Sequence, residues 1–138
     1  MFWRASQIGM SRFAVYWIKP FDSFFARKMH SVAFVTCPDS SVANNLASLL
    51  VTKQLAACVN IVPSIESVYL WNGKLEKSSE LLLIIKTRSS LMEELITTVK
   101  ANHPYDCPEV ISFEIQNGSP DYLNWITNST SQLPYVYH

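Results

Sequence analysis

The sequence predicts an α+β fold, in which two helices cover one face of a four-stranded antiparallel sheet with a long central hairpin and a C-terminal helix. Segments rich in β-branched residues alternate with segments of helical hydrophobic spacing, in the order strand, helix, strand, strand, helix, strand. An Asn-Gly pair separates the two middle strands, which is typical of a tight hairpin turn. Apolar residues make up 49% and the formal net charge is zero, which excludes a disordered chain.

The 138 residues suffice for one domain, but their charge is unevenly distributed. Residues 1–30 hold five basic residues against one acidic residue, whereas the remainder carries a net charge of −4. We therefore expect a leader or disordered extension over 1–30, a folded domain over 31–129 and a C-terminal tail over 130–138.

The first strand and helix follow from local pattern. Ser31–Cys37 is a short β-branched and aromatic segment that ends at Pro38. Pro38-Asp39-Ser40 provides a turn and a helix cap, and apolar residues then recur at helical spacing over 40–53, at Val42, Leu46, Leu49 and Leu50.

The middle of the chain predicts the hairpin. A strand over Ala56–Val62 meets Pro63, which indicates an edge, a bulge or a bend. The extended pattern resumes at Ile65, runs to Trp71, turns at Asn72-Gly73 and returns over Lys74–Arg88. Within the returning strand, residues 81–85 are apolar on both faces, so we expect both faces to be covered.

A two-residue turn also fixes the pairing of the two arms. It places Trp71 opposite Lys74, Tyr69 opposite Glu76 and Ile65 opposite Glu80.

Two further helices and one strand complete the predicted domain. Ser90-Leu91-Met92-Glu93 fits a capping box for a helix over 90–102, with Leu91, Met92, Leu95, Ile96 and Val99 on one face. Val110–Ile115 is the fourth strand, and Ser119-Pro120 begins a last helix with Tyr122, Trp125 and Ile126 on its buried side. The order is that of the ferredoxin-like plan.

The predicted hairpin is too long for one copy of the domain to cover. Each arm of about 15 residues extends about 50 Å, whereas a helix of about 13 residues covers about 20 Å. The overhang is apolar and aromatic, so we expect it to pack against other copies in a closed ring. Charged residues within it suggest a cleft between subunits, with plain sheet packing as the alternative.

Three cysteines without a secretory signal favour free thiols in a reducing compartment. Cys37 and Cys58 are either small buried hydrophobes or metal ligands. The leader is basic and aromatic and has no apolar segment long enough to cross a membrane, so the location is cytoplasmic or, through residues 1–30, mitochondrial.

Several motifs in register resemble the CutA family of divalent cation tolerance proteins over about residues 32–127. These motifs are Thr36-Cys37-Pro38-Asp39, Leu55-Ala56-Ala57-Cys58-Val59-Asn60, Tyr69-Leu70-Trp71-Asn72-Gly73-Lys74, Lys86-Thr87, His103-Pro104-Tyr105 with Pro108-Glu109, and Tyr122-Leu123 with Trp125. The resemblance implies a ferredoxin-like homotrimer, similar to the PII signalling proteins, joined through its long hairpins.

The resemblance also implies a role in tolerance of copper or another divalent cation, without catalysis. The metal candidates are His103, Cys37 and Cys58, although Val35 and Asn102 replace a cysteine and a histidine of bacterial relatives. The candidates for a ligand cleft are Tyr69, Trp71, Lys86, Tyr105, Glu109 and Trp125.

Three other functions compete with this one. A hydrolase of the acylphosphatase type needs an anion-binding loop after the first strand, and Cys37-Pro38-Asp39-Ser40 has no arginine or glycine. An RNA-binding sheet fits poorly with a negatively charged domain, so no nucleic-acid partner is expected. A trimeric scaffold or anchoring protein that recruits a protein partner remains the alternative to ligand binding.

Overall fold

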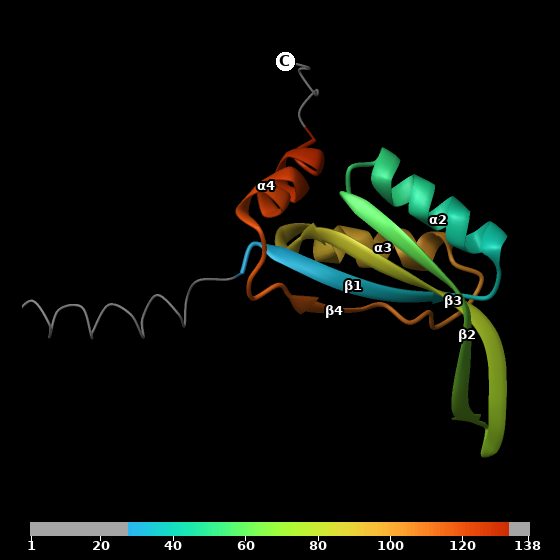
Figure 1. The fold of residues 1–138 in the computed structure, drawn as a ribbon. Coiled ribbons are helices and arrows are strands. Elements are labelled where there is room, and N and C mark those ends of the chain that lie inside the picture. Colours follow the sequence, from blue (N-terminus) through green and yellow to red (C-terminus); the bar gives the residue numbers. More distant parts are fainter. Residues whose placement is uncertain (1–27, 133–138) are drawn as a thin grey trace, which may run out of the picture.

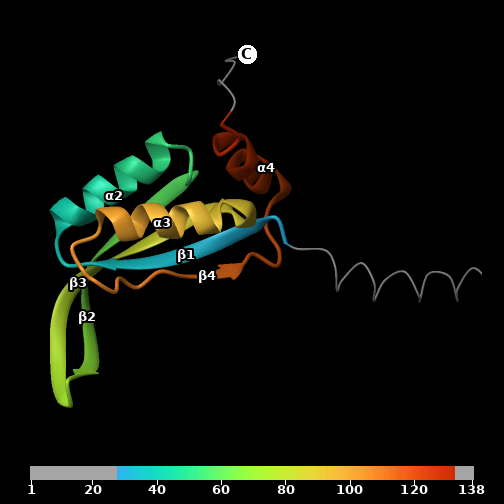
Figure 2. The same cartoon turned by 180° about the vertical axis from the view of Figure 1, so that it is seen from behind.

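The computed structural model describes residues 28–132, and the predicted leader and tail lie almost wholly outside this range. Four strands form one antiparallel sheet in the order β2-β3-β1-β4, as the α+β prediction requires. Helices α2 (Ser40–Thr52) and α3 (Met92–Asn102) both lie on the same face of this sheet (Figures 1 and 2). The ferredoxin-like fold is confirmed.

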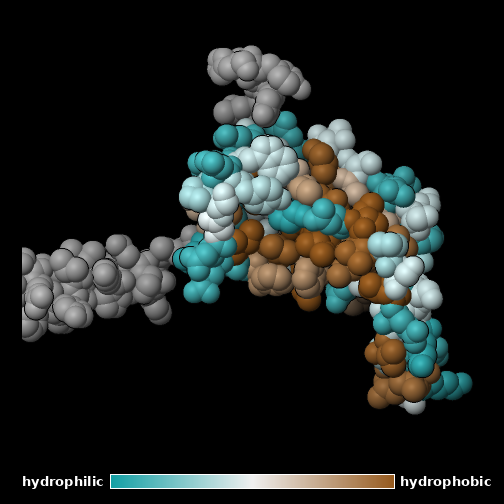
Figure 3. Space-filling view, viewed as in Figure 1, coloured by the Kyte–Doolittle hydropathy of each residue, from teal (hydrophilic) through white to brown (hydrophobic). Residues whose placement is uncertain are grey.

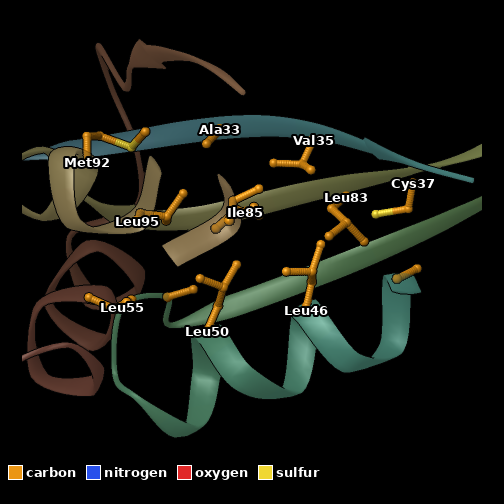
Figure 4. Close-up of a cluster of buried hydrophobic side chains, with 13 residues drawn as sticks. Ala33, Val35, Cys37, Leu46, Leu50, Leu55, Leu83, Ile85, Met92 and Leu95 are labelled. Carbon is orange, nitrogen blue, oxygen red and sulfur yellow. The ribbon is translucent and has the colours of Figure 1, made fainter. Parts of the chain in front are cut away.

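The core lies between this sheet face and the two helices. In β1 (His30–Cys37), Ala33, Val35 and Cys37 alternate with less buried residues and point toward α2 and α3. Leu46 and Leu50 of α2 meet them from the other side (Figure 4). The predicted cap of α2 is present, because the Asp39 carboxylate accepts a 2.9 Å hydrogen bond from the Val42 N–H.

The start of α3 differs from the prediction. A turn of 3₁₀ helix over Ser89–Leu91 precedes α3, and no side chain caps either N-terminus, so the capping box is wrong. Contacts to Ser31 of β1 and to Met29, just before β1, hold this turn instead. The Ser89 N–H donates to the Met29 carbonyl at 2.8 Å, and the Ser89 hydroxyl shares a 2.6 Å hydrogen bond with the Ser31 hydroxyl.

The hairpin of β2 (Cys58–Trp71) and β3 (Lys74–Arg88) has the predicted register, including all three predicted pairs. Its turn places Asn72 and Gly73 at φ of 50° and 75°, which matches a tight hairpin turn. The register shifts by one residue between Val62 and Ile65, beside Pro63, so the proline marks a bulge. Beyond the bulge the hairpin leaves the body of the domain (Figures 1 and 2).

The second face of the sheet is open and apolar. Phe34 pairs with Ile84 of β3 and with Ile111 of β4 (Ile111–Glu114), so all three side chains point away from α2 and α3. Phe113 meets Phe34 edge-on, with ring centroids 5.3 Å apart. Figure 3 shows hydrophobic residues across this face and again at the end of the hairpin.

The prediction that residues 81–85 of β3 are covered on both faces is therefore fulfilled on one face only. The apolar pattern of residues 81–85 predicts that something also packs on the open face of β3, and residues 28–132 of one copy do not do so.

The last helix, α4 (Pro120–Ser129), lies at the end of the sheet opposite the hairpin (Figure 1). Ile126 is fully buried, but Tyr122 and Trp125 are 44% and 41% exposed, so placing them on its buried side was wrong. The reason is that α4 packs mainly on the ends of β1 and β3, where the His30 ring bonds the Thr127 hydroxyl at 2.8 Å. None of the helices between residues 28 and 132 is long and apolar enough to cross a membrane.

Candidate functional site

Two loops meet where the hairpin leaves the body, and His103 lies between them. β1 ends at Cys37, and the chain leaving α3 brings in the His103 ring, which is only 8% exposed. Its Nε2–H donates to the Thr36 carbonyl at 2.8 Å, and its Nδ1 accepts from the Tyr105 N–H at 3.1 Å. These two bonds require the neutral imidazole, with both nitrogens occupied.

A buried carboxylate lies beside this histidine. Glu80 is only 7% exposed, and its Oε2 accepts a 3.4 Å hydrogen bond from the Tyr105 hydroxyl. The Tyr105 ring packs on the His103 ring, with centroids 4.8 Å apart. Burial, Glu80 and the nearby Tyr69 and Cys37 all raise the pKa of Tyr105.

The base of the hairpin completes this arrangement. The Tyr69 hydroxyl shares a 2.9 Å hydrogen bond with the Ser78 hydroxyl. Ser78 precedes Glu80 by two residues, so both side chains leave β3 on the same side. We call Tyr69, Ser78, Glu80, His103 and Tyr105 the hairpin-base cluster.

Within one copy, Cys37 and Cys58 do not come together beside His103 as metal ligands. Cys37 is fully buried, and its pKa is raised to about 11 by burial and then by Glu80 and Asp39. Cys58 is opposite Lys86 whereas Cys37 is opposite Leu81, so the two thiols are five residues, about 16 Å, apart along β3. Within residues 28–132, no three His, Cys, Asp or Glu side chains gather as metal ligands.

A second set of predicted residues lies near α4. The Lys86 ammonium donates to the Asn60 side-chain carbonyl. Cys58, opposite Lys86, lies near the Tyr122 hydroxyl, whose pKa is raised by burial and then by this thiol. The Tyr122 ring packs on Trp125 at 5.5 Å. We call Cys58, Lys86, Tyr122 and Trp125 the α4 group.

The predicted cleft residues therefore do not form one pocket in a single copy. Tyr69 and Tyr105 belong to the hairpin-base cluster, and Lys86 and Trp125 belong to the α4 group. Trp71 stands at the end of the hairpin, 63% exposed, and Glu109 is exposed in the loop before β4. From Glu80 to Lys86 is six residues of β3, or about 20 Å.

Sequence reasoning missed two members of the hairpin-base cluster, Ser78 and Glu80. The register did place Glu80 opposite Ile65. Its burial depends on Tyr105, 25 positions further along the chain, and no local pattern reports such a contact.

The fold and these groups define a class: a ferredoxin-like α+β domain with an overhanging hairpin, an open apolar sheet face and polar groups at both ends of the sheet. Residues 31–129 match the family model of the CutA1 divalent ion tolerance protein, and the chain belongs to this family.

Curated relatives and solved structures agree with this assignment. Chloroplastic protein CutA of Arabidopsis thaliana is 57% identical over 99 residues, which cover 72% of this chain and 54% of that protein. The divalent-cation tolerance protein CutA of Thermus thermophilus is 42% identical, covering 74% of this chain and 99% of that protein. The crystal structure of CutA1 from Oryza sativa is 50% identical, with a TM-score of 0.73 and coverage of 77% and 98%.

The chain spans just over half the length of the plant and mouse proteins it matches.

Proposed function

We propose that this chain acts as a homotrimer in divalent cation tolerance and binds a metal ion or small molecule in clefts between its copies. The observation that supports this proposal is the open apolar sheet face together with the overhanging hairpin. A large apolar face in water is unfavourable and typical of an interface. A ring of three copies covers both surfaces without growing into a fibre.

The separation of the two polar groups supports a cleft between copies. The hairpin-base cluster and the α4 group are too far apart within one chain to touch one small ligand. A neighbouring copy that brings its α4 group to the hairpin base would complete a binding site. Tyr69, Trp71, Lys86, Tyr105, Glu109 and Trp125 remain the candidate cleft residues.

The described residues of one copy do not fit a bound metal ion. Both nitrogens of His103 are hydrogen-bonded, and Cys37 is buried with a raised pKa. If the ligand is a metal ion, a second copy must supply ligands and His103 must give up its bond to Thr36. We propose no catalysed reaction for this chain.

Light scattering and calorimetry of the full-length chain test this proposal. We expect a mass of three chains, and Cu(II) binding, if present, to be lost in His103→Ala but kept in His30→Ala, the matched histidine at the far end of β1. Equal Cu(II) affinity in wild type and His103→Ala would remove the histidine from the site. A stable single-chain mass would contradict the proposal as a whole.

A scaffold function is the second candidate, and the end of the hairpin favours it. Leu70, Trp71 and Leu75 are each more than 60% exposed there. An exposed aromatic and aliphatic cluster suits recognition of a protein partner. A trimer that binds neither Cu(II) nor any small ligand would favour this function.

The destination of the chain is a separate proposal. The two plant relatives are named chloroplastic, so a plastid is a candidate destination alongside the cytoplasm and the mitochondrion. Fusing residues 1–30 to a fluorescent reporter tests this, and a diffuse cytosolic signal would contradict organelle import.

A further inference from the structure

Glu80 is a buried carboxylate without a counter-cation in its own copy. Its one hydrogen bond from a side chain is the 3.4 Å contact from the Tyr105 hydroxyl, near the outer limit for such a bond. Over residues 28–132, the one ion pair joins Lys77 to Glu66. Buried charges in proteins are normally paired, because an isolated charge is costly to remove from water.

The neighbours of Glu80 do not supply this positive charge. His103 is held neutral, because its Nδ1 accepts a hydrogen bond and its Nε2 donates one. Cys37, Asp39, Tyr69 and Tyr105 are neutral or acidic. The local field therefore favours a cation from outside this copy.

The chemistry of the cluster selects the kind of cation. A divalent metal ion takes several oxygen, nitrogen or sulfur ligands, and the described part of the chain gathers no three such ligands. A single carboxylate beside an aromatic ring instead suits an ammonium group, which gains both a charge partner and a cation–π contact. Tyr105, whose hydroxyl donates to Glu80, and Tyr69, whose hydroxyl bonds Ser78 two residues before Glu80, supply the rings.

We propose that the hairpin-base cluster is a subsite for an ammonium group, with Glu80 as its charge partner and Tyr69 and Tyr105 as its aromatic walls. The ammonium group comes from a free amine or from a lysine of a second copy. This inference rests on the proposed cleft between copies, because Glu80 is only 7% exposed in one copy and its cation would come from outside that copy.

Calorimetric titration of the full-length chain tests the free-amine source. The probes are n-propylammonium and tetramethylammonium chloride, with sodium chloride at equal ionic strength as reference. We expect Glu80→Gln to bind at least about tenfold more weakly than wild type, because the charge is lost while the shape is kept. Glu76→Gln is the matched control, because Glu76 is an exposed glutamate on β3, the strand that carries Glu80, and pairs with Tyr69 of β2. This variant should bind the amine as wild type does.

Light scattering over a dilution series tests the lysine source. If a neighbour's lysine fills the subsite, no free amine binds, and Glu80→Gln dissociates at a concentration at least about tenfold higher than wild type and Glu76→Gln. The mass of the wild-type chain tests the trimer independently of the variants. A wild-type chain that stays a monomer at all concentrations contradicts the trimer, and the amine titration then tests the ammonium subsite by itself.

A second pair of variants keeps the test valid if Glu80→Gln does not fold. Tyr105→Phe retains the ring and should keep amine binding or assembly, whereas Tyr105→Leu removes the ring and should weaken it. The proposal is overturned if Glu80→Gln equals Glu76→Gln in both amine affinity and assembly, or if Tyr105→Leu equals Tyr105→Phe in both. Zn(II) binding that requires Glu80, in a chain that binds no amine, would also overturn it.

Discussion

At the scale of single residues, the three cysteines differ sharply in environment. Cys37 is buried in the core, Cys58 is half-buried on β2 and Cys107 is exposed in the loop before β4. Only the thiolate reacts with alkylating reagents, so reactivity depends on both access and pKa. The exposed thiol of Cys107 should therefore react first.

We predict that iodoacetamide at about pH 8 labels Cys107 rapidly and leaves Cys37 unlabelled in the folded chain.

The pKa of Cys37 supports this prediction. Folding raises the pKa of Cys37 from 9.0 to about 11, so the thiol form stabilises the fold below pH 9. This contribution is lost as pH rises from 9 toward 11, because the unfolded thiol ionises first. Timed labelling with peptide mass mapping measures the labelling rates of Cys37 and Cys107, with urea-unfolded protein as control. Equal labelling rates for Cys37 and Cys107 in the folded chain would contradict it.

The burial of a single side chain could be predicted from the sequence where the contacts that bury it follow from the local strand pattern. The burial of Cys37 follows from the alternation in β1 and agrees with one of its two interpretations from the sequence, the small buried hydrophobe. The burial of Glu80 and the partial exposure of Tyr122 depend on segments distant in the chain. Hydrophobic periodicity gives the face of an element but not what covers that face.

At the scale of elements, the bulge in β2 decides where the hairpin leaves the body. Ser64 follows Pro63 in the left-handed region, at φ 60°, which is unfavourable for a residue with a Cβ. The one-residue register shift accompanies this conformation. Bulges bend and twist a strand, so this position sets the direction of the overhang.

We predict that Ser64→Val lowers the free energy of unfolding by about 1–2 kcal/mol, because a β-branched residue is strained at positive φ. Ser64→Gly should be neutral or slightly stabilising, since glycine adopts this region freely. Ser79→Val, at an exposed position of β3, is the control and should have little effect. Urea unfolding measures all three, and a Ser64→Val variant as stable as Ser79→Val would show that the bulge bears no strain.

Element boundaries were predictable where a residue with restricted backbone geometry marks them. Asn72-Gly73 gave the turn and hence the register, and Pro63 gave the bulge. The start of α3 was not predictable, because Ser31 of β1 and Met29, just before β1, hold the 3₁₀ turn that replaces the capping box. A capping motif is a local signal, and here a tertiary contact overrides it.

At the scale of the whole molecule, the two faces of the sheet differ in whether the chain covers them. The covered face forms the core with α2 and α3, and its residues are close to fully buried. The open face carries apolar residues as well, yet Ile111 and Phe113 are 54% and 52% exposed. A change on the open face should therefore act on assembly rather than on the fold of one copy.

We predict that Phe113→Lys separates the proposed homotrimer into single chains that remain folded, because the lysine places a charge on the open face and leaves the core unchanged. Dissociation should occur at a concentration about tenfold or more above that of wild type. For three chains this corresponds to about 2.7 kcal/mol or more per trimer, because the dissociation constant scales with the square of the concentration. Val51→Lys, at an exposed position of α2, adds the same charge elsewhere and should leave assembly intact. Light scattering gives the mass and circular dichroism the helix content. A Phe113→Lys variant that keeps the wild-type mass at every dilution would show that the open face is not the interface.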